Sequence, residues 1–450
     1  MRKLLEAIKR NYFLFFIIIL ILATKPVLLH SNPVSKAINL EVPSSAYIHI
    51  PFCRRRCYYC DFPVAVVGDR LRGETSGTIS DYVETLCQEI INTPALGHPL
   101  ETIFFGGGTP SLLSIDQLSL ILETLKQRFG IYPEAEISME MDPGTFTLEQ
   151  LQGYILAGIN RISLGVQAFQ PELLKLCGRS HNVDDIHAAI ELIHQTKVKN
   201  FSLDLMVGLP HQSLTQWQAS LETAVASNPK HISIYDLTIE PGTAFGRYYQ
   251  PGVQPLPSDD NTVQMYCLAS EILTAAGYEH YEISNYAQPG YQCRHNRVYW
   301  KNRPYYGFGM GATSYVNRQR FTRPRKTKEY HQWVQDFIDT KGVLDYPQTC
   351  PEEVLLETLM LGLRLAEGIS LPMLAAQFGE EKLEHIWTCL QPYCRKGWVE
   401  FVGTIAQLYY QKGWREVDGK KLHEWRLRLS DPQGFLFSNV VLADLFNQLG

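Results

Sequence analysis

The sequence predicts an α/β fold, a partial (β/α)6 barrel followed by further segments. From residue 46 onward, short runs rich in apolar and β-branched residues alternate with stretches of helical periodicity. The runs are apolar throughout, which is typical of parallel strands covered by helices on both faces. Six such units favour a partial barrel, although strand counting leaves a doubly wound sheet open. The expected strands span residues 46–50, 102–105, 136–141, 161–166, 201–207 and 231–237, and the expected helices span residues 81–91, 115–129, 148–157, 183–195 and 214–226.

Composition divides the 450 residues into four segments. Residues 1–45 form an N-terminal extension, and residues 46–240 form the barrel. Residues 241–350 are rich in Tyr, Pro, Gly and Asn, which predicts a β-rich extension with one clear helix near residues 262–276. Residues 351–450 contain three helical stretches and two strand-like stretches, which predicts a winged-helix-like module. Acidic residues outnumber basic ones in that module, so DNA binding is not expected.

Charge and cysteine content narrow the class of protein. The net charge of −5 disfavours nucleic acid as a partner, because phosphates call for a basic surface. Three of the ten cysteines cluster within eight residues and the other seven are scattered. That distribution indicates a reducing compartment and one metal site instead of a disulfide scaffold. We therefore expect a cytoplasmic protein.

The N-terminal extension starts with basic residues, followed by an apolar run at residues 13–23. A spanning helix needs about 20 apolar residues, so this run is too short to cross a membrane. Three interpretations stay open: a dispensable extension or mis-assigned start, a weak membrane-surface contact, and a signal peptide.

The strongest chemical signal is the C-x3-C-x2-C loop formed by Cys53, Cys57 and Cys60, directly after the first strand. Such close spacing lets three thiolates reach three irons of one [4Fe–4S] cluster. The fourth iron then stays open for S-adenosylmethionine (SAM), which can chelate it through amino and carboxylate groups. The alternatives are three structural cysteines or a zinc site, and zinc would need a fourth ligand at knuckle spacing.

A glycine run, Gly106-Gly107-Gly108-Thr109-Pro110, follows the second strand. Consecutive glycines let the backbone approach a ligand closely and expose its N–H and C=O groups. A phosphate-binding loop would need a following Gly-Lys-Ser/Thr, which is absent from the sequence. A plain turn is the other interpretation.

Together these motifs resemble the radical SAM coproporphyrinogen dehydrogenase-like family. The resemblance covers about residues 46 to 450 and rests on the cysteine loop, the glycine run and further motifs in the same order. Those motifs are YIHIPFC at 47–53, GGGTPS at 106–111, EMDP at 140–143, GVQ at 165–167, GRSH at 178–181, and DL at 204–205 before GLP at 208–210.

The resemblance also implies residue roles. Tyr47 would line the SAM site and Tyr59 would lie beside the adenine. Gly107, Gly108 and Thr109 would contact the methionine part of SAM. Glu140 would contact its ribose or amino group. Three further positions correspond to residues that contact a second SAM in the dehydrogenase, namely Gln167, Arg179 and Asp204.

Two features separate the chain from the dehydrogenases. Those enzymes carry a further Cys two residues after the third cluster Cys, where this chain has Phe62. Residues 295–300, HNRVYW, match the H-N-x-x-Y-W signature of the haem chaperone branch (HemW-type). The resemblance therefore implies a protein that binds haem as cargo and delivers it to client haem proteins. The alternative is an oxygen-independent coproporphyrinogen III dehydrogenase of porphyrin biosynthesis.

The H-N-x-x-Y-W motif offers candidate haem ligands. His295 could ligate iron through neutral imidazole, and Tyr299 and Trp300 offer flat apolar faces. Cys293 is a second candidate ligand. A structural role for the whole motif is the alternative. No catalytic residue is assigned, SAM turnover stays open, and the pattern leaves a homodimer open.

Overall fold

A computed structural model describes residues 42–449 apart from 70–72, 197, 344–345 and 404–424. The N-terminal apolar run lies outside the described residues. No helix in the described part of the chain combines the length and the apolar character needed to cross a membrane.

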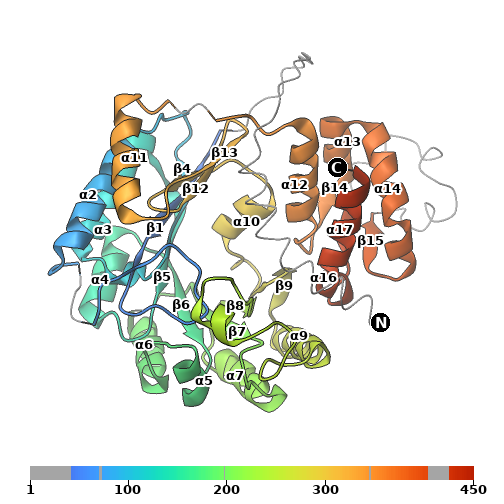
Figure 1. The fold of residues 1–450 in the computed structure, drawn as a ribbon, viewed down its shortest axis with the longest axis horizontal. Helices are drawn as coiled ribbons and strands as arrows, with labels where there is room; N and C mark the ends of the chain where they lie inside the picture. Colours follow the sequence, from blue (N-terminus) through green and yellow to red (C-terminus); the bar gives the residue numbers. More distant parts are fainter. Residues whose placement is uncertain (1–41, 70–72, 197, 344–345, 404–424, 450) are drawn as a thin grey trace.

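A nine-stranded sheet, ordered β11-β1-β4-β5-β6-β7-β8-β10-β9, forms the centre of the molecule (Figure 1). Its six middle strands run parallel, which confirms the predicted (β/α)6 arrangement. β11 extends the sheet in parallel beside β1, whereas β10 and β9 are antiparallel. The six middle strands are β1 (Ser45–Ile50), β4 (Leu100–Gly107), β5 (Ile131–Met141), β6 (Arg161–Gln167), β7 (Phe201–Val207) and β8 (His231–Asp236).

Helices connect successive parallel strands and cover the outer face of the sheet (Figure 1). Three of them begin with a Ser or Thr N-cap that forms a reciprocal capping box with a Gln three residues on, as in Ser114 and Gln117 of α3. This pattern satisfies two backbone N–H groups at each helix start. The covering helices are α2 (Gly77–Asn92), α3 (Ile115–Phe129), α4 (Leu148–Ala157), α5 (Pro171–Leu176), α6 (Val183–Thr196) and α7 (Leu214–Ala226).

The region after β8 contains the expected strands and helix α9 (Asp259–Ala275), together with helices that the sequence analysis did not predict. One of these is α11 (Thr327–Asp339), which buries Tyr330, Val334 and Phe337 at helical spacing. Its remaining residues are mostly polar, which hides this periodicity in the sequence. The other elements are α8 (Ala244–Tyr248), β9 (Glu279–Glu282), β10 (Asn285–Ala287), α10 (Arg294–Trp300), β11 (Tyr306–Phe308), β12 (Thr313–Val316) and β13 (Gln319–Thr322).

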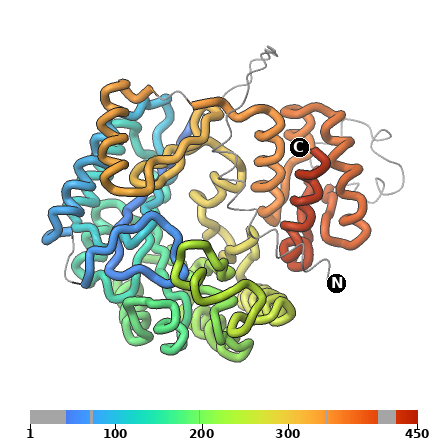
Figure 2. Tube along the Cα trace, viewed as in Figure 1, coloured from blue at the N-terminus to red at the C-terminus, as the bar shows by residue number. Residues whose placement is uncertain are grey.

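The C-terminal part has a hydrophobic core of its own, within residues 355–449. Tyr266 of α9 and Ile283 after β9 pack against this core, so the module rests on the extension next to the barrel (Figure 2). The strand order β14-β16-β15 with three preceding or interleaved helices is the arrangement expected for a winged helix. Its elements are α12 (Pro351–Gly362), β14 (Ile369–Ser370), α13 (Leu371–Phe378), α14 (Glu380–Arg395), β15 (Val399–Val402), β16 (Arg426–Leu429), α16 (Gln433–Leu436) and α17 (Ser438–Leu449).

A buried ion pair fastens the extension to the barrel. Arg323 Nε donates to Glu89 Oε1 of α2 at 2.7 Å, and both side chains are almost fully buried. Tyr330 of α11 donates to the other carboxylate oxygen at 2.6 Å. Removing one partner of such a pair leaves an uncompensated buried charge.

We expect Arg323→Met to lower the free energy of unfolding by about 3–5 kcal/mol, because Glu89 would then be buried without its counter-charge. Adding Glu89→Gln removes that charge and recovers part of the loss. Urea unfolding of the two variants and the wild type measures both effects. If Glu89→Gln further destabilised the Arg323→Met protein, this account of the ion pair would be contradicted.

Candidate functional site

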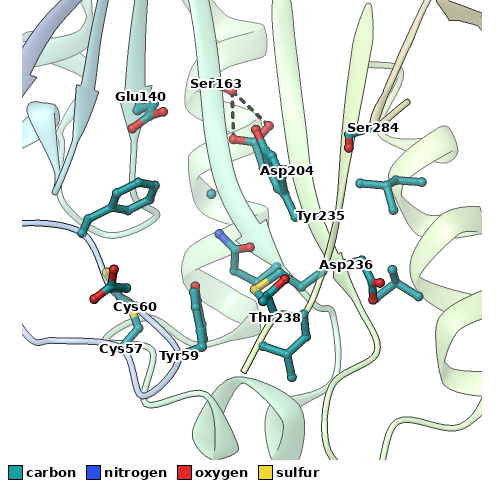
Figure 3. A pocket seen from close by; sticks show the side chains of 18 of the residues that line it. Cys57, Tyr59, Cys60, Glu140, Ser163, Asp204, Tyr235, Asp236, Thr238 and Ser284 are labelled. Atoms are coloured by element: carbon teal, nitrogen blue, oxygen red, sulfur yellow. Dashed lines mark hydrogen bonds between the residues drawn. The ribbon is translucent and has the colours of Figure 1, made fainter. Parts of the chain in front are cut away.

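A cavity of about 620 Å³ lies at the carboxyl ends of the parallel strands, where barrels of this kind carry their ligand sites. The loop after β1 forms one wall, and the ends of β4 to β8 form the floor. Figure 3 shows Cys57, Tyr59 and Cys60 on one side, with Tyr235, Asp236 and Thr238 opposite. Residues of α9, α16 and α17 close the far side, so the C-terminal module contributes to the cavity.

Cys53, Cys57 and Cys60 all line this cavity, and the other seven cysteines do not. Short strand β2 (Phe52–Cys53), paired with β3 (Ala65–Val66), fixes the start of the cysteine loop. The Cys60 amide then donates to the Cys57 carbonyl at 3.2 Å, which folds the loop back. Burial raises the pKa of the Cys53 thiol to about 12 and also raises the pKa of Cys60, so metal binding must displace protons.

The three thiols fit an iron–sulfur cluster better than a single metal ion. Around one ion, at least three ligands converge on a point, and no such group of His, Cys, Asp or Glu occurs among the described residues. A cubane makes a different demand, because each thiolate binds its own iron. Three thiols on one cavity wall would therefore suit a cubane, each binding one of its irons.

The glycine run is required by packing within the protein. A Cβ at Gly107 would lie 2.5 Å from the His49 ring, and one at Gly108 would lie 2.7 Å from the Phe52 carbonyl oxygen. Gly107 also has a φ of 113°. These glycines let β4 approach the start of the cysteine loop, a reason that the sequence analysis did not give. Gly107, Gly108 and Thr109 still line the cavity.

Arg179 joins the cysteine loop to the floor of the cavity. Its Nη1 donates to Tyr59 Oη at 3.2 Å and to Cys57 Sγ at 3.4 Å. Its Nη2 donates to Asp142 Oδ1 at 2.5 Å, and Thr109 donates to the other Asp142 oxygen at 3.3 Å. Asp142 is a site residue that the sequence analysis missed, although it belongs to the quoted EMDP motif. Its signal was its position directly after a buried strand.

Two carboxyl groups on the floor are held largely away from water. Glu140 accepts from the Gly107 amide at 2.9 Å, and burial together with the charge of Asp204 raises the pKa of Glu140 to about 8. Burial likewise raises the pKa of Asp204, whose oxygens accept from Ser163 at 2.8 and 3.0 Å (Figure 3). Asp204 lies in the middle of β7, and Ser202 on the same strand also donates to its carboxylate.

The cavity presents polar atoms that suit a polar ligand. Gln167, the last residue of β6, lines the cavity with a φ of 68°, a conformation uncommon for residues other than glycine. Arg179 Nε and Tyr266 Oη are buried without hydrogen-bond partners among the described residues. A ligand with carboxylate, amino and hydroxyl groups therefore fits this lining.

Tyr47 and His295 lie outside the cavity lining. The Tyr47 hydroxyl lies 3.1 Å from His49 Nδ1. The two ring nitrogens of His295 lie 2.7 Å from Thr102 Oγ1 and 2.9 Å from Tyr299 Oη. Burial lowers the pKa of His295 to about 3, so the imidazole is neutral. Both ring nitrogens of His295 thus have partners within the protein, where α10 meets β4, which favours the structural alternative of the sequence analysis.

The comparisons with known proteins agree with this architecture. The radical SAM superfamily model matches residues 47–224, and the HemN C-terminal domain model matches residues 350–409. The chain is 47% identical to "Heme chaperone HemW" of Synechocystis sp. over 408 residues, covering 91% of this chain and 97% of that protein. It is 43% identical to "Heme chaperone HemW" of Escherichia coli over 297 residues, covering 65% and 76%. The solved structure of coproporphyrinogen III oxidase (HemN) from Escherichia coli superimposes with a TM-score of 0.71 at 22% identity, covering 90% of both chains, a likeness of fold alone.

The raised pKa of Glu140 gives a pH prediction. Because its pKa rises from 4.5 to about 8 on folding, its contribution to stability is full below about pH 4.5 and is lost as the pH rises through 8. Between pH 6 and pH 9, we expect the wild type to lose about 2–3 kcal/mol more unfolding free energy than Glu140→Gln. Urea unfolding of the reduced, cluster-free proteins measures this difference. Parallel losses in both proteins would show that Glu140 is ionised throughout.

Proposed function

The chain belongs to the HemW family of radical SAM proteins, and from that premise we propose that it is a haem chaperone, which binds haem and transfers it to client haem proteins. The observation that carries the proposal is the similarity to a protein named heme chaperone HemW over nearly its whole length. Cytoplasmic residence belongs to the same proposal, because cysteines scattered singly along the chain are typical of a reducing compartment.

In this proposal Cys53, Cys57 and Cys60 hold a [4Fe–4S] cluster, whose remaining iron binds SAM. When bound, the cluster supplies one-electron chemistry. Tyr59 would border the adenine, and its hydroxyl is already held by Arg179. Thr109 would face the methionine part, beside Gly107 and Gly108. Glu140 would accept a hydrogen bond from the ribose or the amino group, and it must lose its proton to bind an ammonium.

Three residues on the cavity floor correspond to contacts of a second SAM in the dehydrogenase, and here they would bind a ligand next to the cluster-bound SAM. Arg179 already forms an ion pair with Asp142. Arg179 is therefore a weaker anchor for a ligand carboxylate than the sequence alone implies. Asp204 and Gln167 face the same space and offer hydrogen bonds to hydroxyl or amino groups. Tyr47 would act indirectly, because its hydroxyl orients His49 against Gly107.

Haem transfer tests the proposed function. We expect anaerobically reconstituted protein to bind haem and to load an apo haem protein faster than haem–albumin does at equal concentration. Cys53→Ala should lose the cluster, because two thiolates cannot replace three. Following the Soret band of the acceptor measures the transfer. A wild-type protein that binds no haem would contradict the proposal.

The dehydrogenase alternative has its own test. Phe62 occupies the position of the additional Cys in the dehydrogenases, so we expect no vinyl product from coproporphyrinogen incubated anaerobically with SAM and reductant. Chromatography of the oxidised porphyrins would detect such a product. Formation of protoporphyrin in stoichiometric excess over the protein would favour the alternative.

A further inference from the structure

Phe62 is an aromatic side chain exposed to solvent at the mouth of the cavity, directly after the cysteine loop. Its residue is 58% exposed, yet it lines the cavity. Its backbone N–H is bonded to the Cys60 thiol, so the residue is held next to the cluster position. Partial exposure of the phenyl ring forgoes part of the gain from burial, and a flat apolar ligand that covered the ring would recover it.

Two guanidinium groups flank Phe62. Arg56 Nη2 donates to the Phe62 carbonyl at 3.4 Å, and Arg325 Nη2 donates to the carbonyl of the preceding residue, Asp61. Arg56 is exposed, and the Arg325 side chain is 50% exposed. A guanidinium has five N–H donors, so both retain donors for a ligand carboxylate.

The acidic groups near the mouth leave this positive character in place. Arg325 lies 3.3 Å from the Asp61 carboxylate, and Arg55 pairs with Asp69 at 2.8 Å. Glu240 also lines the cavity, and burial raises its pKa. The cysteine loop itself carries Arg54 as well as Arg56, the flanking group named above. The arginines at the cavity mouth therefore offer positive charge to a ligand that carries two carboxylates.

The volume of the cavity also favours binding of a tetrapyrrole at the mouth over binding inside the cavity. Pockets for ligands of moderate size measure about 300–1,000 Å³, so 620 Å³ suits SAM beside the cluster and leaves little room for a tetrapyrrole as well. We infer that the tetrapyrrole cargo docks at the mouth, with one face of its ring on Phe62 and its two propionates on Arg56 and Arg325. This inference rests on the proposed haem cargo and names the surface that receives it.

Recognition by the ring face and carboxylates makes a prediction about ligands. Metal-free protoporphyrin IX should bind reconstituted protein within about tenfold of haem, because neither contact involves the iron. Its dimethyl ester should bind at least about tenfold more weakly, because it offers no charge to the arginines. Fluorescence titration at two salt concentrations measures both affinities. Only the affinity for the free acid should fall as the salt concentration rises. Equal binding of acid and ester would overturn the inference.

Variants locate the surface. Phe62→Ala and Arg325→Gln should each weaken haem binding about fivefold or more, and Phe62→Trp should restore it through its flat ring. Exposed residues remote from the cavity provide the controls Leu156→Ala and Arg395→Gln, which should bind like the wild type. Iron content and SAM binding verify that each cluster is intact. If the wild type binds haem and Phe62→Ala binds it equally, the inference is wrong and the proposed function stands. If the wild type binds no haem, both are wrong.

Discussion

The close packing of β4 against the turn that follows β1 is the constraint on which the site depends. At Gly107 and Gly108 the backbone lies so close to His49 and the Phe52 carbonyl that a Cβ would not fit. This contact fixes where the backbone leaves β1, and hence where Cys53 begins its loop. Because parallel strands bring their carboxyl ends to one side, the same contact places the loop over the floor formed by β5 to β8. Larger side chains at these glycines would displace the thiols from the cavity.

Charge in the cavity follows from how each acid is paired. Asp142 forms an ion pair with Arg179, whereas Glu140 and Asp204 form no ion pair among the described residues. The charge of Arg161 lowers the pKa of Asp204 but offsets only part of the effect of burial. The unpaired acids therefore bind protons more readily, and they release them when a cationic or hydroxyl-bearing ligand supplies better partners. Arg179 also contacts Tyr59 and Cys57, so the arrangement of the floor and that of the cysteine loop depend on each other.

Much of the fold could be predicted from sequence because the middle strands are apolar throughout and the helices carry Ser or Thr caps. The cysteine loop was evident from spacing alone. Helix α11 was missed because its polar outer residues mask Tyr330, Val334 and Phe337. Long-range partners could not be predicted either. Nothing local in HNRVYW reveals that Thr102, on a strand far away in the sequence, lies 2.7 Å from the ring of the candidate ligand His295.

In the proposed function, Cys53, Cys57 and Cys60 on one cavity wall hold a cubane whose fourth iron is open to SAM. Analysis of anaerobically reconstituted protein tests it most directly, by counting iron and sulfide and recording the electron paramagnetic resonance spectrum of the reduced cluster with and without SAM. The account predicts about four irons and four sulfides per chain and a spectrum that changes when SAM is added. Bound zinc without sulfide, or a spectrum that SAM leaves unchanged, would contradict it.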